Sequence, residues 1–98
     1  MTNFLNLTSI ALLSTLAFTE AHALEDAEVL GVYVTDRALC GINVDQQLIN
    51  EAIVKVIFRD DLSPSEAKLK GARISVAISS NLQDSGRVAE YCAKRMGR

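Results

Sequence analysis

A charge-free apolar run, FLNLTSIALLSTLAF at residues 4–18, lies near the start of this 98-residue chain. The run is shorter than the roughly 20 apolar residues that a membrane-spanning helix needs. It matches the hydrophobic part of a secretory signal, which is about 7–15 residues long. Ala21 and Ala23 supply the small-x-small cleavage site, so the mature chain would begin at Leu24. We therefore expect residues 1–23 to be a signal peptide and residues 24–98 to fold as a single small domain.

Two other interpretations of the apolar run stay open. The three residues that precede the run, MTN, carry no positive side chain, although a secretory signal usually begins with one. An uncleaved segment would act as an N-terminal membrane anchor or would add a first helix to the folded core. The cleaved form would be exported to the periplasm or the extracellular space. It would also lose His22, the single histidine of the chain.

Composition argues against several classes of partner. The chain is 49% apolar and has a formal net charge of −2, which becomes about −1 once Glu20 is removed with the signal. Nucleic-acid binding and binding to an anionic membrane both rely on an excess of basic side chains. We therefore expect no nucleic-acid partner, and no membrane contact after the signal is cleaved.

Cys40 and Cys92 are the two cysteines of the chain, and both belong to the mature part. An even number of cysteines in a small exported chain predicts a disulfide. The bond would close a loop of about 50 residues, which the chain-entropy account rates at about 4 kcal/mol. A domain of about 75 residues buries only about 60% of its unfolded surface, so such a bond can decide whether it stays folded. In the cytosol the same residues would be buried thiols.

Two segments in the middle of the chain carry helix signals, the first along its whole length and the second at its start. Residues 43–61, NVDQQLINEAIVKVIFRDD, carry apolar side chains in the i, i+4, i+8 rows of one face, and Asn43 can cap the start. Residues 62–82, LSPSEAKLKGARISVAISSNL, open with the capping motif S-x-x-E at Ser63 and a proline in the first turn. Both segments therefore predict helices.

The two ends of the mature chain show the same spacing. Residues 25–41 end at Gly41, which can close a helix, and residues 84–97 begin with Asp84 or Ser85, either of which can cap one. We therefore predict an all-α fold, a small bundle of about four short helices tied by one disulfide. The bond would join the end of the first helix to the middle of the last.

A small α+β fold is the alternative. Residues 29–35, VLGVYVT, and 73–79, RISVAIS, are rich in β-branched side chains that favour strands. Gly31 would weaken a helix by up to about 1 kcal/mol, and Gly71 could end the helix that starts at Ser63. If the helix instead runs through Gly71 to about residue 80, its small side chains would let another helix approach closely. We favour the long helix.

Three short motifs have ordinary structural interpretations. The S-x-x-K match at Ser65 lacks the S-D-N and K-T-G elements of serine acyl-enzymes. Asp60 and Asp61 lack the spaced oxygen ligands of a calcium loop. The acidic residues 25–28 suit the start of a helix. We predict no cofactor and no metal site from these motifs.

The function classes that remain are mostly non-catalytic. Without a histidine or a free thiol, the common serine–histidine and cysteine–histidine mechanisms are excluded, and a chain of about 75 residues has little room for a deep pocket. We expect an exported, non-enzymatic protein that acts through protein–protein contacts, as an inhibitor, a chaperone-like factor or an accessory factor. The alternatives are a structural envelope component and a membrane-anchored domain that keeps its N-terminal helix.

Tyr33 and Tyr91 are the two tyrosines, and each lies near a cysteine. Tyrosine is enriched in binding hot spots, so an exposed pair would be a contact for a protein partner. The other interpretation is that both rings pack against the disulfide.

Overall fold

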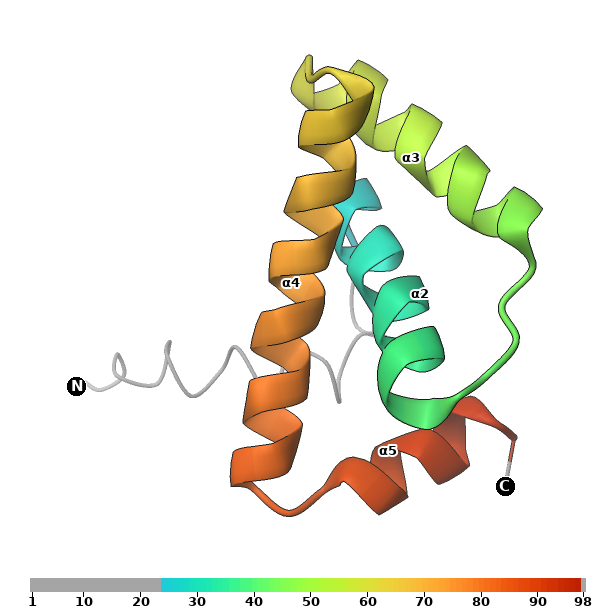
Figure 1. The fold of residues 1–98 in the computed structure, drawn as a ribbon, viewed down its shortest axis with the longest axis vertical. Coiled ribbons are helices and arrows are strands. Elements are labelled where there is room, and N and C mark those ends of the chain that lie inside the picture. The colour runs from blue at the N-terminus through green and yellow to red at the C-terminus, as the bar shows by residue number, and fades with distance from the viewer. Residues whose placement is uncertain (1–23, 98) are drawn as a thin grey trace, which may run out of the picture.

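The structure, a computed structural model, describes residues 24–97, which form four α-helices (Figure 1). The helices are α2 (Asp26–Cys40), α3 (Gln46–Asp60), α4 (Pro64–Asp84) and α5 (Val88–Arg95). No strand occurs in this part of the chain. The predicted all-α bundle of about four short helices is therefore confirmed. The proposed signal and its cleavage residues Ala21 and Ala23 lie outside the described residues.

The alternative α+β fold is wrong, because residues 29–35 lie in α2 and residues 73–79 lie in α4. In a strand, Val76 would share a face with Ile78. In the structure Ile78 is buried at 6% exposure, whereas Val76 points away from the core and is 65% exposed. The β-branched side chains reflect a preference for packed surfaces more than for one backbone conformation. Here the packed surface is the face of a helix.

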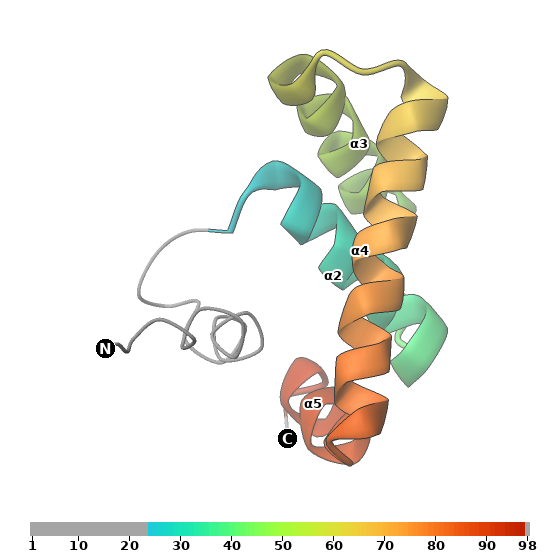
Figure 2. The ribbon, with the colours of Figure 1, turned by 90° about the vertical axis from the view of Figure 1, so that its left-hand side faces the viewer.

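α2 and α4 each pack against all of the other described helices, and the contact between these two is the most extensive. Figure 1 shows the turn between α3 and α4 at one end of the molecule and α5 at the opposite end. Figure 2 shows the same arrangement from the side, with α5 beside the last turns of α4. Among residues 24–97, none of the helices combines the length and the apolar character that crossing a membrane requires.

α2 and α4 cross closely at two glycines. A Cβ placed on Gly71 would lie 2.6 Å from Cγ of Leu30, and one placed on Gly31 would lie 2.8 Å from Cβ of Ile74. Beside the crossing, the fully buried Thr35 hydroxyl is hydrogen-bonded at 2.8 Å to the Ser75 hydroxyl of α4. The long helix through Gly71, and the close approach expected along it, are both confirmed.

The buried apolar residues form two clusters. The larger one, called the main core, comes from α2, α3, α4 and the link before α3; its members are Ala27, Leu30, Val44, Ile49, Ala52, Val56 and Ala67. The smaller one, called the second core, consists of Val32 on α2 with Ile78 and Leu82 on α4. Val88 and Tyr91 of α5 cover the second core. The two ends of the molecule are therefore packed by different sets of residues.

Local capping agrees with the sequence at two helix ends. Ser63 and Glu66 form the expected capping box at the start of α4, and Pro64 occupies the first turn. Gly41 ends α2 with φ of 67°, a left-handed conformation that glycine adopts without strain.

Two predicted caps are wrong. Asp45, not Asn43, caps α3, and its carboxylate accepts a hydrogen bond from the Gln47 amide at 2.9 Å. The helix starts late because Val44 is buried before it, with its carbonyl bound by Arg37 of α2 at 2.8 Å.

Neither Asp84 nor Ser85 caps α5, because both are used at the end of α4. Asp84 is the last residue of α4, and the Ser85 hydroxyl donates to the Asn81 carbonyl at 2.8 Å. The residue before α5 is Arg87, which makes no side-chain cap.

The predicted disulfide is confirmed. Cys40, the last residue of α2, is bonded to Cys92 in the middle of α5, with the two Cα atoms 5.3 Å apart. No free cysteine remains.

Candidate functional site

The two tyrosines do not form an exposed pair. Both are half-buried, and they pack against different clusters, Tyr33 against the main core and Tyr91 against the second core. Leu24, the proposed first residue of the mature chain, is also partly buried against the second core. A partner contact through Tyr33 and Tyr91 stays a prediction.

Tyr91 belongs to a polar cluster around Asp36, which sequence reasoning missed. Asp36 on α2 is only 3% exposed. Its carboxylate accepts hydrogen bonds from the Tyr91 hydroxyl at 3.1 Å and from Nη2 of Arg95 at 2.9 Å. Burial, together with the nearby Asp36 charge, raises the pKa of Tyr91 well above its usual range. The hydrogen bond with Asp36 is the main factor that raises the pKa of Arg95.

The sequence did contain a signal for this cluster. Asp36 follows Val32 by four residues and precedes Cys40 by four, which places it on the apolar face predicted for that helix. A carboxylate on a buried face needs a partner, because burying an unpaired charge is costly. Since its oxygens are all engaged by α5, the cluster holds two helices together and leaves no free base for catalysis.

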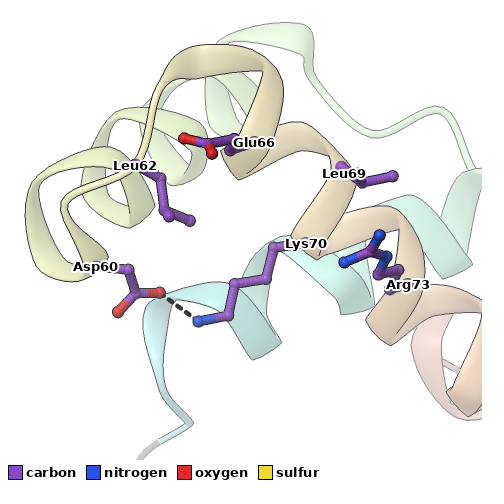
Figure 3. A pocket seen from close by; sticks show the side chains of 6 residues that line it. All are labelled: Asp60, Leu62, Glu66, Leu69, Lys70 and Arg73. Atoms are coloured by element: carbon purple, nitrogen blue, oxygen red, sulfur yellow. Dashed lines mark hydrogen bonds and ion pairs between the residues drawn. The ribbon is translucent and has the colours of Figure 1, made fainter.

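An open pocket of about 720 Å³ lies where the α3–α4 turn leads into α4 (Figure 3). We call it the corner pocket. Figure 3 shows side chains from the end of α3 and the turn on one side of it and side chains along α4 on the other. The lining residues are Asp60, Leu62, Glu66, Leu69, Lys70 and Arg73.

Two of the corner pocket's charges, those of Asp60 and Lys70, are paired with each other. The Lys70 ammonium donates to Oδ2 of Asp60 at 2.7 Å, as the dashed line in Figure 3 marks. The neighbouring Asp61 ends α3 in a left-handed conformation, with φ of 54°. The adjacent aspartates therefore have separate structural roles.

A third charge, that of Glu66, is committed to the capping box. Its carboxylate accepts a hydrogen bond from the Ser63 amide at 2.9 Å. This bond and the contact with the Ser63 hydroxyl lower the pKa of Glu66.

Arg73 and Leu69 are the lining residues of the corner pocket that are available to contact a ligand. Within residues 24–97, Arg73 makes no ion pair, and Leu69 is 49% exposed. A guanidinium beside an exposed apolar side chain can bind a carboxylate that is followed by an apolar group. Phe58, in the last turn of α3 at the same end of the molecule, is 81% exposed. The other large apolar side chains exposed in the described part of the chain are Leu48, Val54, Val76 and Met96.

The acidic residues near the start of α2 and the S-x-x-K motif at Ser65 both lie in the first turns of helices. In the acidic start of α2, the Glu25 amide donates to Glu28 at 2.8 Å, and Asp26 lies 4.0 Å from Arg59. Ser65 is exposed in the first turn of α4. Across residues 24–97, no group of three or more histidine, cysteine or acidic side chains is arranged to hold a metal ion.

Comparison with known proteins found no matching family model, no matching curated protein and no matching solved structure.

Proposed function

We propose that this is a small exported, non-enzymatic protein that acts through protein–protein contacts, and that the corner pocket is its contact site. It would work in the periplasm or the extracellular space as an inhibitor, a chaperone-like factor or an accessory factor. The single observation that carries the proposal is the corner pocket, where an exposed leucine lies beside a guanidinium that has no ion-pair partner within residues 24–97.

Export is supported by the disulfide and by the small size of the domain. Disulfides persist in oxidising compartments, and they are common in small secreted domains that have limited cores. The bond between Cys40 and Cys92 joins α5, the shortest helix within residues 24–97, to a bundle whose main core contains seven buried apolar residues. The signal-like start of the sequence supports the same location.

Binding is favoured over catalysis because the pocket's acids are already engaged. Asp60 is paired with Lys70, and Glu66 accepts a hydrogen bond from the amide of Ser63. A general base or a nucleophile needs a free side chain within hydrogen-bond reach of a substrate. The groups left for a partner are Arg73 and Leu69. The partner segment that fits them carries an acidic residue next to an apolar one.

Chemical cross-linking in the exported fraction, followed by mass spectrometry, tests this function. As an inhibitor or an accessory factor, the native protein should capture one protein at a fixed ratio, whereas as a chaperone-like factor it should capture several proteins. Leu69→Glu and Arg73→Glu should each weaken that capture by about tenfold or more, because an acidic side chain would repel the acidic partner segment. Val76→Glu is the matched control, since Val76 is 65% exposed on the same helix and lies outside the pocket lining.

Circular dichroism establishes that each variant is folded before its capture is compared. Capture that survives both pocket variants would contradict the proposed site. Equal loss of capture in Val76→Glu would do the same.

A further inference from the structure

α5 is packed separately from the rest of the bundle. Every residue of the main core comes from α2, α3, α4 or the link before α3. The close crossing at Gly31 and Gly71 likewise joins only α2 and α4. α5 packs mainly on these same two helices, at the end opposite the α3–α4 turn (Figures 1 and 2). The three longer helices therefore form a packed unit to which α5 is added.

The end of α4 does not depend on α5. The Ser85 amide donates to the Asn81 carbonyl at 3.1 Å, and the Arg87 amide donates to the Leu82 carbonyl at 2.9 Å. Gly86, with φ of 70°, turns the chain away from the helix axis. Because the residues after α4 satisfy its last carbonyls, α4 keeps its end when α5 moves away.

The non-covalent contacts of α5 are few. α5 has 8 residues, and isolated helices shorter than about 12–15 residues are marginal in water. The side-chain hydrogen bonds that join α5 to the other described helices all converge on Asp36, whose side chain is 5% exposed, and they come from Tyr91 and from an Arg95 side chain that is 40% exposed. Both side chains that donate to Asp36 belong to α5, so release of α5 would uncover the carboxylate on that side to water, which can replace these donors.

We propose that the Cys40–Cys92 disulfide is a reducible latch. When the bond is reduced, α5 leaves and uncovers the second core, while α2, α3 and α4 stay folded. The newly exposed face consists of Val32, Ile78 and Leu82, each at most 8% exposed while α5 is docked. The latch lies at the opposite end of the molecule from the corner pocket and does not rest on the function proposed for that pocket.

The reductant is a dithiol. One of its thiolates attacks a sulfur of the disulfide, and Cys40 is the more exposed of the two cysteines. A mixed disulfide forms, and the second thiol of the dithiol then displaces the protein sulfur. Two electrons and two protons pass to the protein. The products are the Cys40 and Cys92 thiols and the dithiol in its disulfide form.

Hydrogen exchange read by mass spectrometry tests the latch, on the isolated disulfide-bonded protein before and after treatment with dithiothreitol. After reduction, the amides of α5 should exchange at least about tenfold faster, while those of α3 and α4 change by less than about threefold. Fluorescence of an apolar dye should rise at the same time, because the second core is exposed. Reoxidation should restore the slow exchange.

Two results would overturn the latch. Unchanged protection of α5, with both thiols shown to be free by alkylation, would mean that non-covalent contacts suffice to hold it. Loss of protection throughout α2, α3 and α4 would mean that the bond holds the whole fold.

Two variants separate the covalent contact from the ionic one. The double variant C40S/C92S should show a released α5 without reductant and no response to it. Asp36→Asn keeps the disulfide and should keep α5 protected. Release of α5 in oxidised Asp36→Asn would assign its docking to the ion pair and contradict the latch. If the double variant does not accumulate, the folded native protein is reduced instead, and its α5 exchange is compared with that of oxidised Asp36→Asn.

Discussion

Gly71 tolerates little change, because α2 crosses α4 directly over it. We expect Gly71→Ala to lower the free energy of unfolding. The new Cβ would lie 2.6 Å from both Cγ and Cδ2 of Leu30, and overpacking of this kind costs about 1–3 kcal/mol. The better helix propensity of alanine offsets up to about 1 kcal/mol of that cost. Urea denaturation measures the net loss.

A double-mutant cycle isolates the clash at Gly71. In a Leu30→Ala background, Gly71→Ala should be neutral or stabilising, because the nearest remaining atom of residue 30 is its Cβ, at 3.5 Å. An equal loss of stability in both backgrounds would show that the clash is not the cause.

Single residues also show where prediction from the sequence succeeds and where it stops. Small side chains along residues 67–78 predicted a close helix approach, and Gly71 makes that approach. Asp36 was not recognised, because its partners Tyr91 and Arg95 lie 55 and 59 positions away in the chain. A helical pattern shows that such an acid is buried, but it does not show what pairs with it.

At the scale of one helix, the start of α4 makes stability depend on pH. The pKa of Glu66 is lower in the folded protein than its usual value of 4.5, chiefly because the carboxylate accepts a hydrogen bond from the Ser63 amide. A lowered pKa means that the stabilisation is present above the unfolded-state value and is lost as the pH falls through the folded-state value. The loss should therefore occur at pH values below about 4.5.

The variant Glu66→Gln tests this pH dependence. It keeps a capping side chain but removes the charge, so it should be less stable than the native protein near neutral pH. The difference should shrink as the pH falls below about 4.5. Chemical denaturation over a pH series measures it. A difference that stays constant over the series would contradict the assigned cause.

Helix starts were predictable only where the capping residues are local. The capping box of Ser63 and Glu66 depends on four consecutive residues, and it forms as expected. α3 begins later than its apolar pattern suggested, since Val44 is held by a hydrogen bond from Arg37 of another helix. α5 begins without a side-chain cap, and Ser85 serves α4 instead. These two starts depend on contacts between elements, which a capping motif does not encode.

For the whole molecule, the first prediction concerns its covalent form. The intact mass of the native protein, measured after alkylation without reductant, should correspond to a chain that begins at Leu24 and carries no alkylated cysteine. The physical reason is that cleavage follows Ala23, and that Cys40 and Cys92 are bonded to each other. Samples should come from both the exported and the membrane fractions.

The contrary result is equally specific. A full-length mass with two alkylated cysteines would show that the signal is not cleaved, that the native protein keeps His22, and that Cys40 and Cys92 are not bonded. A full-length mass found in the membrane fraction with the cysteines still bonded would indicate an N-terminal anchor.

From sequence alone follow the helix over residues 43–61, the start of α4, the glycine that ends α2 at Gly41 and the pairing of the two cysteines. Each of these depends on neighbours within about one or two helical turns, or on there being one intramolecular way to pair two cysteines. The tertiary structure decides that residues 29–35 and 73–79 are helical and with them the all-α class, that Tyr91 and Arg95 of α5 meet Asp36, and that the corner pocket forms. These outcomes depend on which faces of separate helices meet, and so on contacts between residues far apart in the chain.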